Sequence, residues 1–239
     1  MNRLLSCSVV MSTIYRLVSI AVVLNTCSLV FAQTVNINYT DRGTYIPAGE
    51  HKPADVSYIV GDFRGTTLCG PCVNDIRNFF VFDLSSVNQP VASAKLALLV
   101  PGTTPGFASN DGKEAYELHD VTTPIASLVG GTGGVAAHSD LGSGVVYGIR
   151  SMSATDMGNV IEITMNPSAI AAMNSNHGLF AIGGSITSLD GVANNEYAFG
   201  FTGSQSVSEL RLTLVPEPST LLLLGIGAIS LLGYRKAKP

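Results

Sequence analysis

Arg77-Asn78-Phe79-Phe80-Val81-Phe82-Asp83-Leu84-Ser85-Ser86-Val87 has the composition of a β-strand that runs into a turn. Aromatic and β-branched residues favour strands, whereas Asp83 and Ser85 favour turns. Successive side chains of a strand point to opposite faces of its sheet, so Phe80 and Phe82 share one face. The stretch therefore predicts a strand over residues 76–84 that turns these two rings toward a hydrophobic core.

Similar short apolar or alternating segments recur through residues 33–214, with Gly, Asn and Pro between them. In residues 209–214 the leucines alternate with polar residues, which is the two-residue period of a half-buried strand. Many short strands joined by turns predict an all-β fold, and we expect an antiparallel β-sandwich of jelly-roll type. The predicted strands cover residues 35–39, 57–62, 76–84, 94–100, 115–121, 145–152, 160–165, 179–183, 197–201 and 209–214.

One short crossover helix is expected among these strands. Asn166 is a favourable N-cap, Pro167 suits the first helical position, and residues 168–173 are good helix formers. A weaker helical turn is expected over residues 125–128. The glycine-rich segment 130–134 lacks the Lys-Ser/Thr of a phosphate loop, and no helix is predicted after it, so we expect a flexible surface loop there.

Residues 1–32 have the features of a cleavable secretory signal. Arg3 and Arg16 are the charged residues of this segment, and an apolar stretch precedes Ala32. A basic start, an apolar middle and small residues before the cleavage point are typical of such signals. We therefore expect a signal helix that is removed by cleavage between Ala32 and Gln33.

The C-terminal end combines a proline motif, an apolar run and a basic end. Pro216 and Pro218 flank Glu217, and proline can continue neither a helix nor a central strand, so this backbone is expected to be extended and accessible. Residues 220–234 are predicted to be a transmembrane helix, although a shorter span than most. The basic residues after position 234 favour a cytoplasmic end, which leaves the domain outside the membrane.

Residues 215–225, Val-Pro-Glu-Pro-Ser-Thr-Leu-Leu-Leu-Leu-Gly, together with the Arg-Lys end, resemble the PEP-CTERM sorting signal of exopolysaccharide-producing Gram-negative bacteria. The resemblance implies that residues 215–239 are a sorting tail handled by exosortase, a membrane protease-transpeptidase that cuts near Pro216, Glu217 and Pro218. It implies an inner-membrane-anchored precursor that is passed to the cell surface or extracellular matrix. The same tail also carries the description "ice-binding protein C-terminal", which concerns the tail and not ice binding by this domain.

The domain between the two ends resembles carbohydrate-module-like sandwiches of the disaggregatase-related kind and uncharacterised bodies that accompany PEP-CTERM tails. This resemblance implies a β-sandwich extracellular domain and offers no established catalytic residues. The residues that carry it are 77–87 with 94–96, 116–124 and 180–185.

The chain of 239 residues has an acidic middle between basic ends. Residues 33–215 hold eight Lys and Arg against sixteen Asp and Glu, although the net charge of the whole chain is only −4. Such a domain has no surplus of cations to neutralise phosphates, which excludes a nucleic-acid-binding role. The two terminal segments together are richer in hydrophobic residues than the domain, so they raise the 46% hydrophobic content of the whole chain.

Cys69-Gly70-Pro71-Cys72 is the most conspicuous small motif of the domain. Its spacing is that of a dithiol redox site, but a predicted strand follows it instead of a helix, and no βαβ pattern surrounds it. Export to an oxidising compartment favours a loop disulfide between Cys69 and Cys72. A redox or metal-binding role for the pair is the alternative.

Candidate metal ligands and catalytic groups are sparse. The four histidines never fall at zinc-ligand spacing, and no Gly-x-Ser-x-Gly motif occurs. Two Asx-Gly segments with nearby acids offer oxygen ligands for calcium, although Asx-Gly is first a hairpin-turn signal. Tyr39, Tyr45 and Tyr58 are close enough in sequence for a sugar-binding platform, although packed strand tyrosines are commoner. The histidines are His51, His119, His138 and His177, and the acidic segments are Asn110-Asp111-Gly112 with Glu114, and Asp190-Gly191 with Asn194, Asn195 and Glu196.

We therefore expect an exported, exosortase-sorted protein of the cell surface or extracellular matrix, with a structural or interaction role. No enzyme activity, cofactor or metal is predicted. Expected partners are exosortase, exopolysaccharide and, transiently, the membrane. A carbohydrate-binding module is the alternative, and a secreted hydrolase or redox protein is a further one.

Overall fold

A computed structural model describes residues 33–53, 58–63, 73–102, 106–191, 195–200 and 207–215. Residues 33–215 form one compact unit. The predicted signal helix over residues 1–32 and the predicted transmembrane helix over residues 220–234 lie outside the described residues. Among the described residues, no helix has the length and apolar character needed to cross a membrane.

The domain consists mostly of antiparallel strands with few helices, which confirms the predicted all-β class. Every strand pair runs antiparallel. The strands are β1 (Thr34–Tyr45), β2 (His51–Pro53), β3 (Val60–Phe63), β4 (Val73–Asp83), β5 (Val91–Leu99), β6 (Phe107–Ala108), β7 (Lys113–Asp120), β8 (Val146–Ser153), β9 (Val160–Thr164), β10 (Leu179–Ile186), β11 (Glu196–Ala198) and β12 (Ser208–Leu214). Within the described residues the helices are α2 (Ile125–Val129), α3 (Gly134–Asp140), α4 (Pro167–Ser175) and the 3₁₀ helix η1 (Ala154–Asp156).

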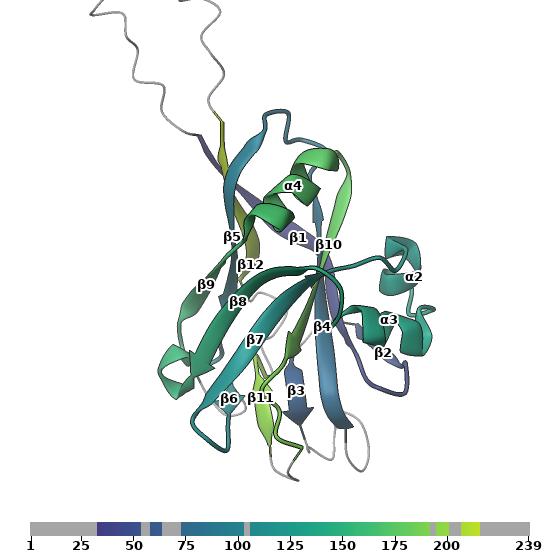
Figure 1. The fold of residues 1–239 in the computed structure, drawn as a ribbon, viewed down its shortest axis with the longest axis vertical. Coiled ribbons are helices and arrows are strands. Elements are labelled where there is room, and N and C mark those ends of the chain that lie inside the picture. The colour runs from purple at the N-terminus through teal and green to yellow at the C-terminus, as the bar shows by residue number, and fades with distance from the viewer. Residues whose placement is uncertain are drawn as a thin grey trace, which may run out of the picture. The chain divides into compact units, whose positions relative to one another are not determined.

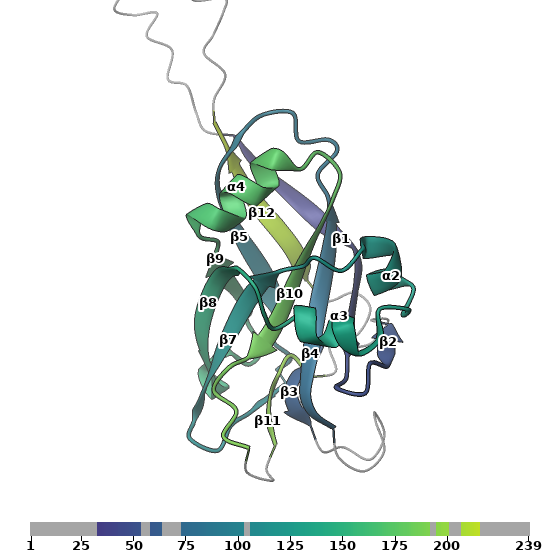
Figure 2. The same ribbon diagram turned by 45° about the vertical axis from the view of Figure 1, so that its right-hand side comes forward.

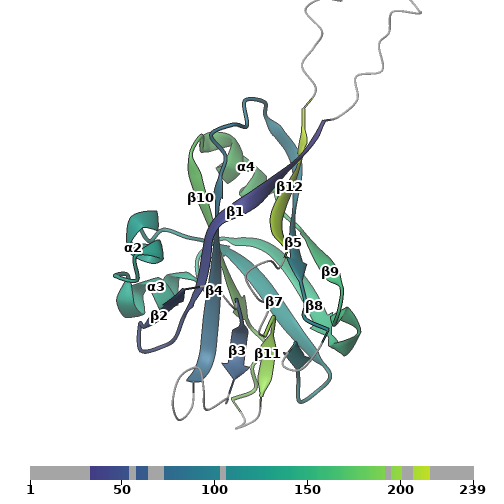
Figure 3. The same cartoon turned by 180° about the vertical axis from the view of Figure 1, so that it is seen from behind.

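The strands follow one continuous curved path instead of the two separate sheets of a jelly roll. The path β9-β5-β12-β1-β4 continues through β10 and β7 to β8. β1 belongs to both halves, because residues 34–38 pair with β12 and residues 39–45 pair with β4. Seen from behind, β1 runs diagonally from β12 to β4 (Figure 3). The jelly-roll expectation is therefore replaced by a single sheet that curls like half a barrel (Figure 1).

The sheet curls far enough to bring its two edge strands, β8 and β9, together. The backbone N–H of Asn166 donates to the Tyr147 carbonyl at 2.7 Å, and its Nδ2 donates to the Val146 carbonyl at 2.6 Å. A Cβ at Gly148 would lie 2.9 Å from the Thr164 carbonyl oxygen, which shows how closely the edges approach. These contacts cover strand edges that would otherwise expose unpaired backbone groups.

The main hydrophobic core fills the concave side of the sheet. Phe80 and Phe82 are fully buried there, as the alternation of β4 predicts. Leu210 and Leu212 of β12 join them, which confirms the predicted buried face of the last strand. Leucine, isoleucine and phenylalanine side chains from both halves of the sheet thus share one core.

A second, smaller core lies on the opposite face of β4. Phe79 and Val81 pack there against Leu128 of α2 and Ala137 of α3. Figure 2 shows α3 beside β4. The weak helical turn predicted over residues 125–128 is confirmed as α2. The prediction that no helix follows the glycine-rich segment is wrong, because α3 begins at Gly134, where a φ of 61° suits glycine.

The predicted crossover helix is confirmed as α4. The Asn166 side chain accepts a hydrogen bond from the Ala169 N–H at 3.1 Å, and Pro167 occupies the start of the helix. Ala169 and Met173 face the main core, so α4 covers one end of the curved sheet (Figure 2). Local sequence signals were sufficient to predict this helix because the capping residue directly precedes it in the chain.

The second core predicts a measurable cost for Phe79→Ala. The substitution removes a ring that is fully buried between β4 and the α2–α3 segment, so we expect the free energy of unfolding to fall by about 3–5 kcal/mol. Urea denaturation of the purified domain measures this loss. Leu179→Ala on the neighbouring strand is the control, since Leu179 is exposed, and it should change stability by about 0.5 kcal/mol. A similarly small effect of Phe79→Ala would contradict the assignment of a second core.

Candidate functional site

A polar cleft opens where β4 and β10 separate. Gly184 of β10 still pairs with Asn78, but beyond this point β4 pairs with β3 and β10 pairs only with β7. Asn78 is fully buried at the point of separation, where it accepts a hydrogen bond from the Tyr116 hydroxyl at 2.8 Å and donates to the Tyr58 carbonyl. The cleft has a volume of about 440 Å³, within the range of small-molecule pockets. Its polar lining consists of Asp62, Asp75, Arg77, Ser185, Thr187 and Glu196.

Arg77 is held rigidly at the edge of this cleft. Its Nη2 lies 2.7 Å from Asp75 Oδ2 and its Nε lies 3.1 Å from Asp75 Oδ1, so the ion pair is bidentate. Its Nη1 donates to the carbonyls of His138 and Ser139, both at 3.0 Å. Because those carbonyls belong to the end of α3, Arg77 both lines the cleft and fixes the α2–α3 segment on the sheet.

Ser185 and His119 are buried beside the cleft, and the half-buried Glu117 lies next to them. Ser185 Oγ lies 3.3 Å from His119 Nε2, and Glu117 Oε2 lies 3.7 Å from the same nitrogen. Burial lowers the pKa of His119, although the charge of Glu117 opposes this, so the ring is neutral near pH 7. In a catalytic triad the acid contacts the other ring nitrogen. Here His119 Nδ1 is buried without a hydrogen-bond partner in the described part of the chain, so this arrangement differs from a triad.

The two segments considered for calcium lie close together. Asn110 Nδ2 donates to Asp190 Oδ2 at 3.4 Å, and the Ser188 hydroxyl donates to Glu114. Burial raises the pKa of Glu196, and the nearby charges of Glu114 and Asp190 act in the same direction. Within the described ranges no group of three or more His, Cys, Asp or Glu side chains is placed to hold a metal ion, and Asn194 lies outside those ranges.

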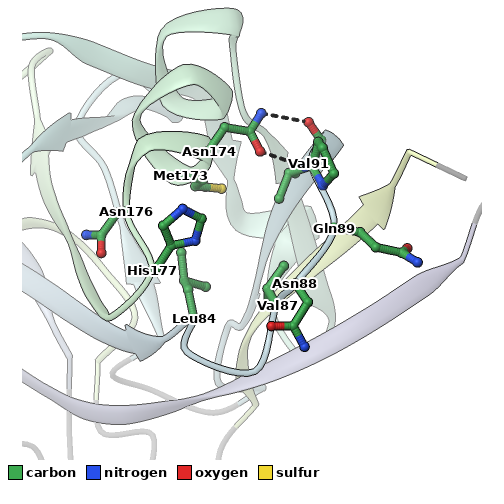
Figure 4. A pocket seen from close by; sticks show the side chains of 10 residues that line it. Leu84, Val87, Asn88, Gln89, Val91, Met173, Asn174, Asn176 and His177 are labelled. Carbon is green, nitrogen blue, oxygen red and sulfur yellow. Dashed lines mark hydrogen bonds between the residues drawn. The ribbon is translucent and has the colours of Figure 1, made fainter. Parts of the chain in front are cut away.

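A second hollow lies at the other end of the domain, between the β4–β5 loop and the end of α4 (Figure 4). Its volume is about 150 Å³. Asn174 closes one side of the hollow with two hydrogen bonds to Val91. Its Oδ1 accepts from the Val91 N–H at 2.7 Å, and its Nδ2 donates to the Val91 carbonyl at 3.0 Å. The rest of the lining combines apolar side chains, neutral amides and one imidazole ring, from Leu84, Val87, Asn88, Gln89, Pro90, Met173, Asn176 and His177.

The other residues considered from the sequence occupy scattered positions. Tyr45 and Tyr58 are fully buried in different clusters, so they do not form a sugar-binding platform with Tyr39. His177 is exposed and lines the second hollow. Gln33 is the first residue of the domain, and its carbonyl accepts a hydrogen bond from the Leu214 N–H at 2.8 Å. The predicted disulfide, cleavage and motif residues that lie outside the described residues are Ala32, Cys69, Cys72, Pro216, Glu217 and Pro218.

His51 packs in an aromatic group at the edge of the second core. Its ring centroid lies 5.1 Å from that of Tyr45 and 5.7 Å from that of Phe79. Its Nε2 is buried and has no hydrogen-bond partner within the described residues. Burial therefore lowers the pKa of His51, although the charge of Asp41 opposes the effect. The spacing of the histidines in the sequence does not predict this environment of His51, because residues from three strands and a loop form it.

The lowered pKa of His51 predicts acid sensitivity of the domain. Below about pH 6.5 the histidine of the unfolded chain binds a proton more readily than the half-buried His51 ring of the folded domain. The free energy of unfolding therefore falls as the pH falls through this range. His51→Phe keeps an aromatic ring and removes the titration, so its urea midpoint should fall less between pH 7.5 and pH 5.5 than that of the wild type. The matched control His177→Phe changes an exposed ring and should keep the wild-type slope. Equal slopes for all three proteins would refute the role of His51.

Comparison with known protein families gives one finding. The family model for the PEP-CTERM protein-sorting motif matches residues 214–237, so the matched segment starts at the last residue of β12. No curated protein matches the chain. The chain therefore carries a PEP-CTERM sorting motif at its C-terminal end, and this motif indicates an extracellular protein that is recognised and sorted by exosortase.

Proposed function

We propose that the curled β domain is the cargo of this sorting motif and that it has a non-enzymatic structural or interaction role at the cell surface or in the extracellular matrix. The observation that carries the proposal is the position of the motif. It begins at Leu214, where the last strand of the domain ends, so the domain and the motif follow one another directly.

The physical reason for this boundary lies in β12 and the prolines that follow it. β12 is held between β1 and β5, and the Val215 N–H donates to the Pro90 carbonyl at 2.7 Å. Pro216 and Pro218 have no backbone N–H to donate to a neighbouring strand, so the ladder cannot continue through them. The prolines thus separate the folded domain from the following segment, which a processing enzyme can bind.

The remaining steps of the proposed route rest on the two ends of the chain. Residues 1–32 direct export and are removed before Gln33. Residues 220–234 hold the precursor transiently in the inner membrane, with the basic end in the cytoplasm. Exosortase then cuts near Pro216, Glu217 and Pro218 and passes the domain to the surface or to a matrix that contains exopolysaccharide.

Replacing Pro216, Glu217 and Pro218 together by alanine tests this proposal. We expect the full-length chain to accumulate as a membrane-bound precursor and the surface fraction to fall at least about tenfold, because the enzyme loses the segment it grips. Immunoblots of membrane and surface fractions, with the intact mass of the product, measure both effects. Alanine at the exposed residues Thr132, Ser151 and Thr164 is the control and should leave sorting unchanged. Normal sorting of the triple motif variant would refute the proposal.

A carbohydrate-binding module is the second candidate function, and the cleft between β4 and β10 favours it. Its lining offers carboxylates, a guanidinium and hydroxyls whose orientations are fixed by neighbouring groups, with Ile186 and Leu189 as apolar contacts. Hydroxyl-rich ligands need such preoriented donors and acceptors because each buried polar group must find a partner. The cleft is therefore the candidate sugar-binding site, in place of the expected platform of tyrosines.

Blocking the cleft tests this second candidate. Thr187 is exposed and lines the cleft, so Thr187→Tyr should fill part of it and lower the affinity for any glycan that it binds by at least about tenfold. Binding to immobilised glycans, including the exopolysaccharide of the producing organism, provides the measurement. Thr164→Tyr on β9 is the matched control, because Thr164 is exposed and lies outside the cleft lining. If wild type and both variants bind glycans equally, or not at all, the cleft is no carbohydrate site.

A further inference from the structure

The second hollow lies at the place where the chain leaves the domain. We call residues 84–91 and 173–178 the exit rim, since they line or border this hollow (Figure 4). Pro90 of the exit rim accepts the hydrogen bond from the Val215 N–H at 2.7 Å, and Val91 is the cross-strand partner of Leu214. The C-terminal end of β12 and Val215 are therefore paired with the exit rim itself.

The covalent length of the chain limits how far the sorting motif can lie from Val215. A residue spans at most about 3.6 Å, so Pro216, Glu217 and Pro218 all lie within about 11 Å of Val215. An enzyme that grips these residues must approach the exit rim, unless the end of β12 first detaches. Detachment would expose Leu214, which is 4% exposed, and would break the bonds of Leu214 and Val215 to Gln33 and Pro90. Binding of the enzyme beside the intact exit rim therefore costs less free energy than detachment of β12.

The exit rim differs in chemistry from the rest of the domain. It contains no Asp, Glu, Lys or Arg, although residues 33–215 hold sixteen acids and eight basic residues. Leu84, Val87 and Met173 give the hollow an apolar lining, and Asn88 and Gln89 offer neutral amides at its edge. Protein interfaces are depleted in charge at their centres because uncharged groups lose less hydration free energy on burial. The exit rim therefore suits contact with a protein.

We propose that the exit rim is a second recognition surface for exosortase, which would place an apolar side chain in the hollow while it holds the Pro-Glu-Pro motif. This inference rests on the proposed sorting of the domain. It assigns part of the recognition to the folded cargo instead of to the tail alone. Recognition then requires a folded domain directly before the motif, so an unfolded cargo is processed slowly.

Charges placed on the exit rim test the proposal in the full-length chain. Asn88→Glu with His177→Glu changes two exposed positions, and we expect processing of the precursor to slow at least about fivefold in a pulse-chase experiment, which corresponds to about 1 kcal/mol. The melting temperature of the processed domain should stay unchanged. Thr132→Glu with Ala136→Glu adds the same charge at exposed positions of the α2–α3 segment and should be processed at the wild-type rate.

A six-residue Gly-Ser linker between Val215 and Pro216 gives an independent test. The linker separates the exit rim from the motif, so we expect it to slow processing of the wild-type domain and to remove the further effect of the rim charges. Wild-type rates for both the rim variant and the linker variant would overturn the inference. If the linker instead restores the rim variant to the wild-type rate, repulsion from an anionic membrane explains the data, and the inference fails.

Two controls complete the test. One distinguishes the exit-rim proposal from the proposed sorting function, and the other asks whether a second copy of the chain binds the hollow instead of exosortase. Loss of processing in the triple alanine variant of the motif, with normal processing of the rim variant, would refute the exit rim and leave the proposed function intact. Normal processing of the triple alanine variant would refute the proposed function itself. A dimer of the processed domain that the rim variant abolishes would assign the exit rim to self-association and overturn the inference.

Discussion

The division of β1 between two partners is the constraint on which the rest of the structure depends. Its first residues pair with β12 and its last residues pair with β4, with a shift of register between Tyr39 and Asp41. Arg42 is buried just after this shift, with its guanidinium 4.2 Å from the Tyr39 ring centroid and 4.8 Å from that of Tyr58. Its Nη1 donates to the Ser208 hydroxyl of β12 at 2.8 Å. A cation that contacts both halves of the sheet thus fixes the bend between them.

The bend has consequences for both ends of the domain. The curled sheet encloses the main core and brings β8 against β9, while β4 at its centre must bury both of its faces. At one end β4 and β10 separate and leave the polar cleft. At the other end β12 finishes beside Pro90, so the sorting motif follows directly from a strand that is paired on both sides. The two candidate surfaces therefore lie at opposite ends of the same central strands.

Sequence reasoning succeeded where the signal was contiguous and failed where distant segments had to meet. The N-cap of α4 and the alternating leucines of β12 are local features, and both were predicted. Phe79 was not predicted to be buried, because its partners belong to α2 and α3, about fifty residues further along the chain. The glycines before α3 indicated a loop, since single-sequence propensity does not register the packing of Ala137 against β4.

The sequence by itself determined the all-β class, the helix after Asn166 and the sorting motif, because propensity, capping and a contiguous motif depend on neighbouring residues. Only the tertiary structure decided that the strands form one curled sheet, that Arg77 and Ser185 line a common cleft, and that the β4–β5 loop meets the end of α4 beside Val215. These features require pairing between strands far apart in the chain. The alternation within each strand decides which face it buries, but no hairpin turn joins these strands to fix their register, so only the shared core can select the pairing.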